Sequence, residues 1–147
     1  PEMSARAVAD AVLDRLGADD CEDFILVNFA NTDMVGHTGS LDAAVQAAEA
    51  VDALVGEIVD ATLDRGGALI VTADHGNAEQ MWDPETRAPH TAHTLYDVDC
   101  TVVGAGDDVE SLRAGGRLAD VFPTVLDLLG LERPSAMTGR SLLDLDP

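Results

Sequence analysis

Imidazole side chains are confined to three short polar segments of this 147-residue sequence, and two of these segments also carry an aspartate. The segments are residues 31–37, 72–77 and 89–94, and together they contain all four histidines. Carboxylate oxygen and neutral imidazole nitrogen are ligands that Mn²⁺, Zn²⁺ and Co²⁺ accept in proteins. The candidate donors are Asp33, His37, Asp74, His75, His90 and His93. They are numerous enough to hold two divalent ions.

Each segment has a way of gripping an ion and also an ordinary structural role. Asp33 and His37 are four residues apart, so they share one face if their segment turns helically. Asp74 and His75 are adjacent and can reach one ion from a sharp turn after a strand. Asp-His-Gly is nevertheless common in turns, Asp33 alone can cap a helix, and His90 is ambiguous. Metal binding is predicted because the three segments combine while the rest of the chain has no histidine.

The polar segments alternate with apolar segments of helical and strand character. Apolar residues recur every three or four positions in three stretches, which predicts helices. These stretches are residues 4–16, 41–65 and 118–129. Short apolar runs predict strands, the first two of them buried on both faces. These runs are residues 24–29, 68–72 and 101–103.

The order strand, helix, strand across residues 24–72 is that of a βαβ unit, with parallel strands and a right-handed crossover. The predicted fold class is therefore α/β. Loops that follow parallel strands gather at the carboxyl edge of the sheet, where such folds place their ligand sites. Residues 31–37 and 72–77 both follow predicted strands, so we expect them to meet at this edge.

The composition is strongly acidic, with 28 acidic and 8 basic residues, no lysine and a net charge of −20. Nucleic acid and anionic membranes are therefore poor partners. Adaptation to high salt explains the excess of acid, because counter-ions screen the repulsion. A high genomic GC content is the alternative, and it explains the missing lysine but not the excess of acid.

The sequence shows no pattern that predicts membrane insertion, secretion or a metal site built from cysteines. No apolar run approaches the roughly 18–20 residues of a membrane-spanning helix, and no signal segment opens the chain, so we expect a cytoplasmic protein. Cys21 and Cys100 lie far apart without a second ligand at metal-binding spacing, which predicts two reduced, packed thiols. The chain opens Pro-Glu-Met-Ser and moves directly into helical periodicity, so we expect it to be part of something longer.

Three motifs resemble the metal-site motifs of the cofactor-independent phosphoglycerate mutases, within the alkaline phosphatase superfamily. They read Asn-Phe-Ala-Asn-Thr-Asp-Met-Val-Gly-His-Thr-Gly at 28–39, Thr-Ala-Asp-His-Gly-Asn-Ala-Glu at 72–79 and His-Thr-Ala-His-Thr at 90–94. Residues 1–4 and 116–124 also match. The resemblance implies a three-layer sandwich with a mostly parallel sheet, incomplete in this chain, and two metal ions. These ions are expected to be Mn²⁺, with Zn²⁺ or Co²⁺ possible. The implied ligands are Asp33, His37 and His93 for one ion and Asp74 and His75 for the other.

The resemblance also implies what this sequence lacks. In the family, an amino-terminal segment carries a further aspartate ligand and the serine nucleophile, and a separate substrate-binding domain is inserted. Neither is present, so residues 1–147 are expected to be the carboxy-terminal portion of the metal-binding phosphatase domain. No catalytic residue is assigned. In particular, no serine of this chain is the expected nucleophile, whether Ser4, Ser40, Ser111, Ser135 or Ser141.

The implied reaction interconverts 3-phosphoglycerate and 2-phosphoglycerate through a phosphoserine, with the two ions steadying the transfer. Without the nucleophile, the chain is expected to be inactive alone. Two other classes remain open. Another phosphomutase or phosphatase of the superfamily should lack the motif at residues 28–39. A non-catalytic metal-binding protein, complete as it stands, explains the missing serine but not the missing sheet partners.

The charge generates the first prediction. Repulsion between acidic groups is screened by salt, so the melting temperature should rise between dilute buffer and molar KCl. Thermal melts followed by circular dichroism in the two buffers measure this change. A midpoint that does not move would leave high GC content as the better explanation of the composition.

Overall fold

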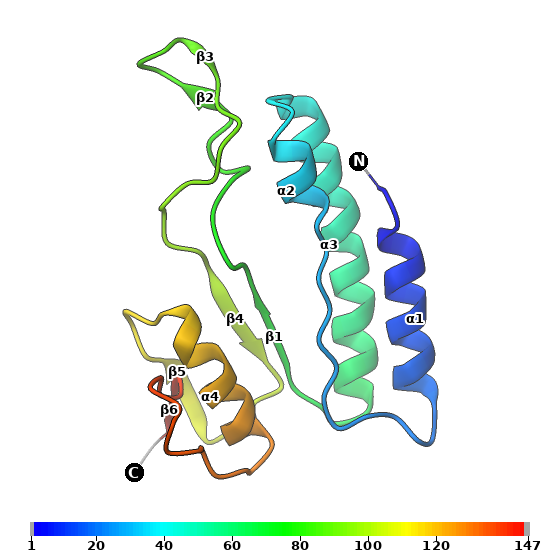
Figure 1. Cartoon of the computed structure of the whole chain (residues 1–147). Coiled ribbons are helices and arrows are strands. Elements are labelled where there is room, and N and C mark those ends of the chain that lie inside the picture. Colours follow the sequence, from blue (N-terminus) through cyan, green and yellow to red (C-terminus); the bar gives the residue numbers. More distant parts are fainter. Residues whose placement is uncertain (1, 146–147) are drawn as a thin grey trace.

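The computed structural model describes residues 2–145, which form helices, short strands and long connecting loops. The helices are α1 (Ala5–Gly17), α2 (Asn31–Gly36), α3 (Leu41–Asp64) and α4 (Leu118–Leu128). The strands are β1 (Leu69–Thr72), β2 (Trp82–Asp83), β3 (Ala88–Pro89), β4 (Cys100–Val103), β5 (Val109–Leu112) and β6 (Leu143–Leu145). The β1–β4 pair lies between the α1–α3 pair and α4 (Figure 1). Among the described residues, no helix is long and apolar enough to cross a membrane.

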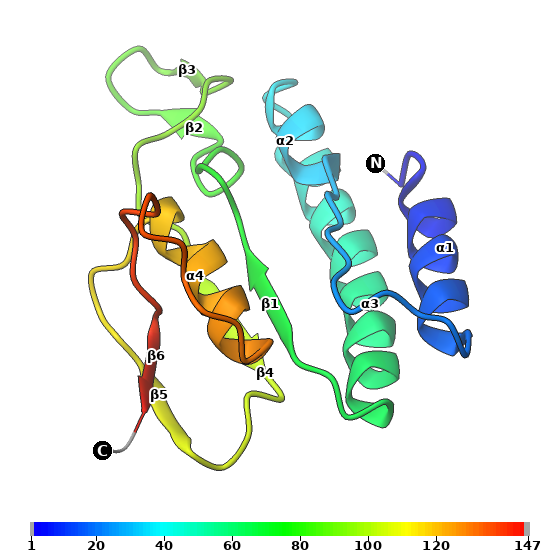
Figure 2. The same cartoon turned by 60° about the horizontal axis from the view of Figure 1, so that its bottom comes forward.

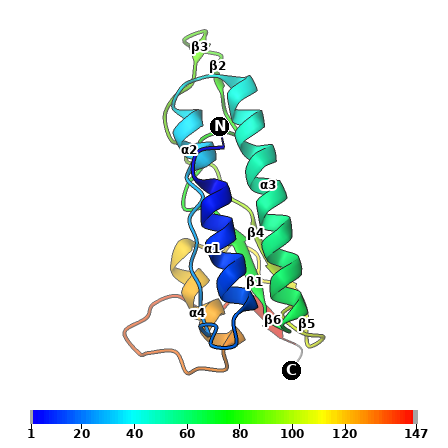
Figure 3. The same cartoon turned by 90° about the vertical axis from the view of Figure 1, so that its right-hand side faces the viewer.

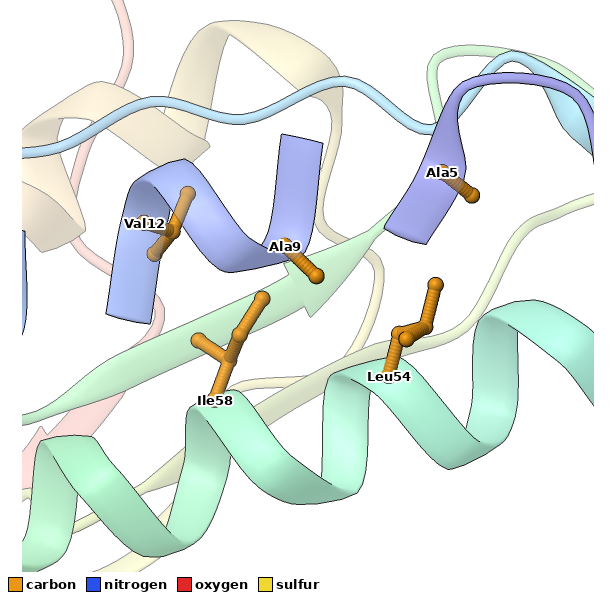
Figure 4. Close-up of a cluster of buried hydrophobic side chains, with 5 residues drawn as sticks. All are labelled: Ala5, Ala9, Val12, Leu54 and Ile58. Carbon is orange, nitrogen blue, oxygen red and sulfur yellow. The ribbon is translucent and has the colours of Figure 1, made fainter. Parts of the chain in front are cut away.

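The two longest helices, α1 and α3, pack along each other and form the main apolar core (Figures 3 and 4). Buried Ala5, Ala9 and Val12 of α1 face buried Leu54 and Ile58 of α3. The spacing of three and four residues puts each set on one helix face, and the small alanines let the helices approach closely. The helices predicted at residues 4–16 and 41–65 are therefore confirmed.

Polar contacts fix both ends of α3. The side-chain oxygen of Ser40 accepts a hydrogen bond from the Ala43 N–H at 3.4 Å, which is the capping arrangement expected for serine. At the other end, the Arg65 guanidinium donates to the carbonyl oxygens of Leu16 and Ala18 at 2.7 and 3.0 Å. Helix α3 is thereby fastened to the end of α1, and the pair supplies a firm support for the loops of the site.

The strand predicted at residues 24–29 is wrong for the described part of the chain, because the segment is extended but joins no sheet. Its side chains alternate, so that Ile25, Val27 and Phe29 pack on the helical core while Leu26 is 83% exposed. A strand exists only through hydrogen bonds to a neighbour. A hollow of about 1450 Å³ is lined by this segment on one side and by β1 on the other, which leaves the segment without that neighbour.

Strand β1 pairs with β4 instead, and the pairing is antiparallel, from Leu69 opposite Val103 to Thr72 opposite Cys100. The strands predicted at residues 68–72 and 101–103 are confirmed, whereas the predicted parallel βαβ pairing is not formed within residues 2–145. The other pairs, β2–β3 and β5–β6, are also antiparallel. Both cysteines are free and partly buried, as expected, and burial raises the pKa of the Cys100 thiol.

A buried carboxylate, that of Asp120, fastens the start of α4 to the segment near β6. The two parts of the backbone lie close together in Figure 2. Asp120 is 4% exposed, and it accepts hydrogen bonds from the Arg140 N–H at 2.9 Å, the Arg113 guanidinium at 3.0 Å and the Arg117 N–H at 3.1 Å. These bonds, the Arg140 N–H foremost, lower the pKa of Asp120 to about 2. The helix predicted at residues 118–129 is confirmed, and its first turn is held by this one side chain.

Replacement of Asp120 by asparagine should lower the melting temperature by several degrees at neutral pH, because an amide cannot accept all three hydrogen bonds. The pKa is lower in the folded than in the unfolded chain. The carboxylate therefore stabilises the fold above its ordinary pKa of 3.8, and this contribution fades as the pH falls toward about 2. Thermal melts of wild type and variant at about pH 7 and about pH 3 should show the gap narrowing in acid.

Asp127→Asn is the matched control, since Asp127 is an exposed carboxylate on the same helix. It should melt close to wild type at both pH values. An equal loss in the two variants, or a gap for Asp120→Asn that does not change with pH, would contradict the role assigned to Asp120.

Candidate metal centre

The first polar segment forms the short helix α2 and its C-terminal cap, and Asp33 and His37 lie on one face of this turn. His37 directly follows the last residue of α2, and its N–H donates to the Asp33 carbonyl. The Asp33 Oδ1 and His37 Nε2 atoms are 3.3 Å apart. The helical turn that was required to bring Asp33 and His37 together is therefore present. Helix α2 lies beside one end of α3 (Figures 1 and 3).

His93, from the third polar segment, completes a close group of three donor atoms. Its Nε2 is 3.1 Å from Asp33 Oδ1 and 3.2 Å from His37 Nε2. Ligands of one tetrahedral ion, at about 2.0–2.2 Å from the metal, lie roughly 3.3–3.6 Å from each other. The three atoms already have nearly this spacing, so the donor set fits one divalent ion after a small expansion.

The tautomer of His37 is fixed by the backbone of the third segment. Its Nδ1 lies 2.7 Å from the Thr91 carbonyl oxygen, which can only accept a hydrogen bond. Nδ1 therefore carries the proton, and Nε2 presents a lone pair toward Asp33 and His93. Histidines that bind metals are commonly oriented by such a bond from the second ring nitrogen.

Asp74 and His75 lie next to this group but are less closely engaged. The His75 ring stacks on the His93 ring, with centroids 3.7 Å apart and planes inclined by 20°. His75, His93 and Asp33 each offer a ligand atom within 4.8 Å of the others. Asp74 is mostly exposed, and its Oδ1 is 3.6 Å from His75 Nε2. The structure thus brings His75 to the edge of the first group, with Asp74 outside it.

His90 takes no part in the three-donor group described above. Its N–H donates to the Met81 carbonyl at 3.0 Å beside the β2–β3 hairpin. Its Nδ1 is buried, and no described residue makes a hydrogen bond to it. The sequence left the role of His90 open, and its position favours the structural alternative.

Asn77 contacts the group and Glu79 contacts Asn77, although sequence reasoning gave neither residue a role. The Asn77 side-chain N–H donates to Asp33 Oδ1 at 2.8 Å, and Glu79 accepts hydrogen bonds from the Asn77 N–H at 2.6 Å and from the Thr94 hydroxyl. Asn77 ends the polar segment that follows β1, and Glu79 lies two residues further along the same loop. Polar residues of these types are common in loops, so their presence there gives little signal.

Hydrogen bonding keeps both carboxylates ionised. The Asn77 amide, followed by the neighbouring imidazoles, lowers the pKa of Asp33 below its ordinary value. Burial acts to raise the pKa of Glu79, but the bonds from Thr94 and the backbone outweigh it, and the pKa lies below its ordinary value. The anionic Asp33 carboxylate and the imidazole nitrogens beside it form a donor set suited to a divalent cation.

Comparison with known proteins agrees with this chemistry. A model of the metalloenzyme superfamily matches residues 1–133. The chain belongs to the metalloenzyme superfamily. Among the proteins similar to it is the 2,3-bisphosphoglycerate-independent phosphoglycerate mutase of Rhodopirellula baltica, 59% identical over 98% of this chain and 26% of that protein. The enzyme of the same name from Clostridioides difficile is 53% identical over 97% of the chain and 28% of its own length.

A solved structure gives the same result for the fold. The structure of Leishmania mexicana phosphoglycerate mutase at low cobalt concentration superposes with a TM-score of 0.89 at 33% identity. The superposition covers 99% of this chain and 29% of the Leishmania mexicana chain. The resemblance to cofactor-independent phosphoglycerate mutases and the α/β, alkaline-phosphatase-like fold class are thereby confirmed, for part of that fold. The chain spans about a quarter of the length of the relatives it matches.

Proposed function

We propose that this chain is the metal-holding part of a 2,3-bisphosphoglycerate-independent phosphoglycerate mutase, the carboxy-terminal portion of its phosphatase domain. The observation that carries the proposal is the convergence of Asp33 and His37 with His93, from two separated segments, to within 3.1–3.3 Å of one another. The relatives reported above, matched over nearly the whole chain, are phosphoglycerate mutases. In this proposal the full-length protein interconverts 3-phosphoglycerate and 2-phosphoglycerate.

The proposed ligands divide between two ions. Asp33, His37 and His93 hold one ion, because their donor atoms share a common centre and the proton on His37 Nδ1 leaves Nε2 free. Asp74 and His75 hold the second and contribute only two donors. Mn²⁺ is the proposed metal, since oxygen and imidazole donors suit it, and Zn²⁺ and Co²⁺ are accepted by the same set. When bound, such a pair of ions activates a nucleophilic oxygen and neutralises phosphoryl oxygens.

The remaining parts of the proposed enzyme lie outside this sequence. We assign the nucleophilic serine, a further aspartate ligand and the substrate-binding domain to other parts of the longer protein. The hollow between residues 24–29 and β1 is the place where a missing sheet neighbour fits. It is lined by both extended segments, and the side chains of Phe24, Val71 and Phe122 stand exposed along it. The chain alone is accordingly proposed to be inactive.

A chimera tests the function directly. Replacing the matching quarter of the Rhodopirellula baltica mutase by this chain should give an enzyme that converts 3-phosphoglycerate to 2-phosphoglycerate when Mn²⁺ is supplied. The chain on its own should show no turnover, because it lacks the proposed nucleophile. An enolase-coupled assay of both proteins measures this difference.

The control chimera carries His93→Ala, which removes one proposed ligand and should reduce kcat/KM by a factor of at least about 100. A folded chimera without activity, or turnover by the isolated chain at a comparable rate, would refute the proposal. So would an active chimera that tolerates His93→Ala.

Metal titration of the isolated chain tests the division of ligands. Three donors hold a divalent ion with water completing its shell, whereas two donors rarely suffice. We therefore expect one Mn²⁺ to bind appreciably and a second weakly. His93→Ala should abolish the main binding event, and His75→Ala should leave it within a few-fold. Electron paramagnetic resonance of free Mn²⁺ during titration in molar KCl measures both constants.

His90→Ala serves as the matched control, since His90 lies in the same segment as His93 but outside the donor group. Circular dichroism establishes that each variant is folded before titration. Loss of the main event in His75→Ala together with its retention in His93→Ala would show that the two sites are assigned the wrong way round.

A further inference from the structure

The second and third polar segments are joined by very little backbone structure. An isolated bridge pairs Gly76 with Thr94, in which the Thr94 N–H donates to the Gly76 carbonyl at 2.9 Å. Both segments are otherwise irregular at this point. His93 directly precedes the bridge on one side, and His75 directly precedes it on the other. The positions of these imidazoles therefore depend on whatever stabilises a single backbone contact.

Glu79 spans this contact with its carboxylate. One oxygen accepts the Asn77 N–H at 2.6 Å, and the other accepts the Thr94 hydroxyl. Thr94 is buried, so its hydroxyl needs a partner within the protein. Both carboxylate oxygens of Glu79 are thus committed to the two segments, and the side chain is a direct link between the loop after β1 and the residue next to His93.

Asn77 extends the link to the first segment. Its side chain is buried and donates to Asp33 Oδ1 at 2.8 Å and to the Asp33 carbonyl at 3.3 Å. The oxygen that receives the first bond is the one that faces His37 and His93. A carboxylate oxygen has more than one lone pair, so this bond orients Asp33 without using up its capacity to bind an ion.

Close packing leaves these side chains little freedom. A Cβ at Gly36 would overlap the Asn77 amide, and a Cβ at Gly76 would overlap both the Glu79 carboxylate and the Thr94 hydroxyl. The two positions must therefore be glycine for the polar side chains to reach their partners. Thr94, Glu79, Asn77 and Asp33 form a continuous chain of hydrogen bonds across all three segments.

We propose that Glu79 is a positioning residue for the metal centre, acting through Thr94 on His93 and through Asn77 on Asp33. This inference rests on the ligand assignment of the proposed function, and it adds a second layer of residues to it. Outer partners of metal ligands typically change metal affinity by about 10–100-fold when removed. Glu79 bonds to two residues that hold different ligands of the same ion, so its loss should affect both.

Glu79→Ala tests the proposal with two independent readouts. In the folded chain, the dissociation constant for Mn²⁺ should rise by about 10-fold or more. Without metal, the Thr94 N–H should exchange with solvent at least about 10-fold faster, since its bond to Gly76 loses its support. Amide exchange within α3 should not change, because the helix core is remote from the substitution.

Glu79→Gln and Glu85→Ala separate positioning from charge. A glutamine at position 79 keeps an oxygen for the Asn77 N–H and an N–H for the Thr94 hydroxyl, so it should restore affinity to within about 3-fold of wild type. Glu85 is an exposed carboxylate of the β2–β3 hairpin, and its removal should change neither readout. Equal losses in Glu79→Gln and Glu79→Ala would show that only the charge matters and would overturn the proposal.

The two readouts also distinguish this inference from the proposed function. Failure of the wild-type chain to bind Mn²⁺ would refute the ligand assignment, and the metal-free exchange measurement would then decide the role of Glu79 in holding the segments. Unchanged exchange at Thr94 in Glu79→Ala would overturn the positioning role whether or not metal binds. Faster exchange together with weaker binding, rescued by glutamine, supports it.

Discussion

The candidate centre depends on one atom, the Oδ1 oxygen of Asp33. His93 Nε2, His37 Nε2 and the Asn77 amide nitrogen lie 3.1, 3.3 and 2.8 Å from it, and they come from three separate segments. A partly buried anionic oxygen attracts hydrogen-bond donors such as the Asn77 N–H, and it attracts a cation, which the lone pair on His37 Nε2 can then also bind. Its position at the start of α2 therefore determines where the other segments must bring their side chains.

Support for that oxygen comes from the helical side of the molecule. Helix α2 rests beside α3, whose start is capped by Ser40 and whose body is packed against α1. The second and third segments have no comparable support, because β1 and β4 form a pair of only four residues each before the loops begin. Side-chain hydrogen bonds consequently carry more of the organisation there than backbone pairing does.

The sequence predicted correctly the features whose pattern lies within a single segment. The helical period of residues 41–65 is local, and so is the confinement of all four histidines to polar segments. Sequence reasoning failed at residues 24–29, because a strand is a relation between two segments and composition does not reveal the partner. Asn77 and Glu79 were missed for the same reason. Their importance lies in contacts with Asp33 and Thr94, which are distant in sequence.

The distribution of positive charge explains why this centre is suited to a cation from solution. Four arginines of the described chain pair with carboxylates away from the centre, namely Arg6, Arg15, Arg113 and Arg117. No ion pair found among residues 2–145 joins an arginine to Asp33 or Asp74. With a net charge of −20, the surrounding field also favours accumulation of cations. The carboxylates of the centre are therefore left to imidazole and amide donors. These donors orient the carboxylates but do not neutralise them as a divalent ion can.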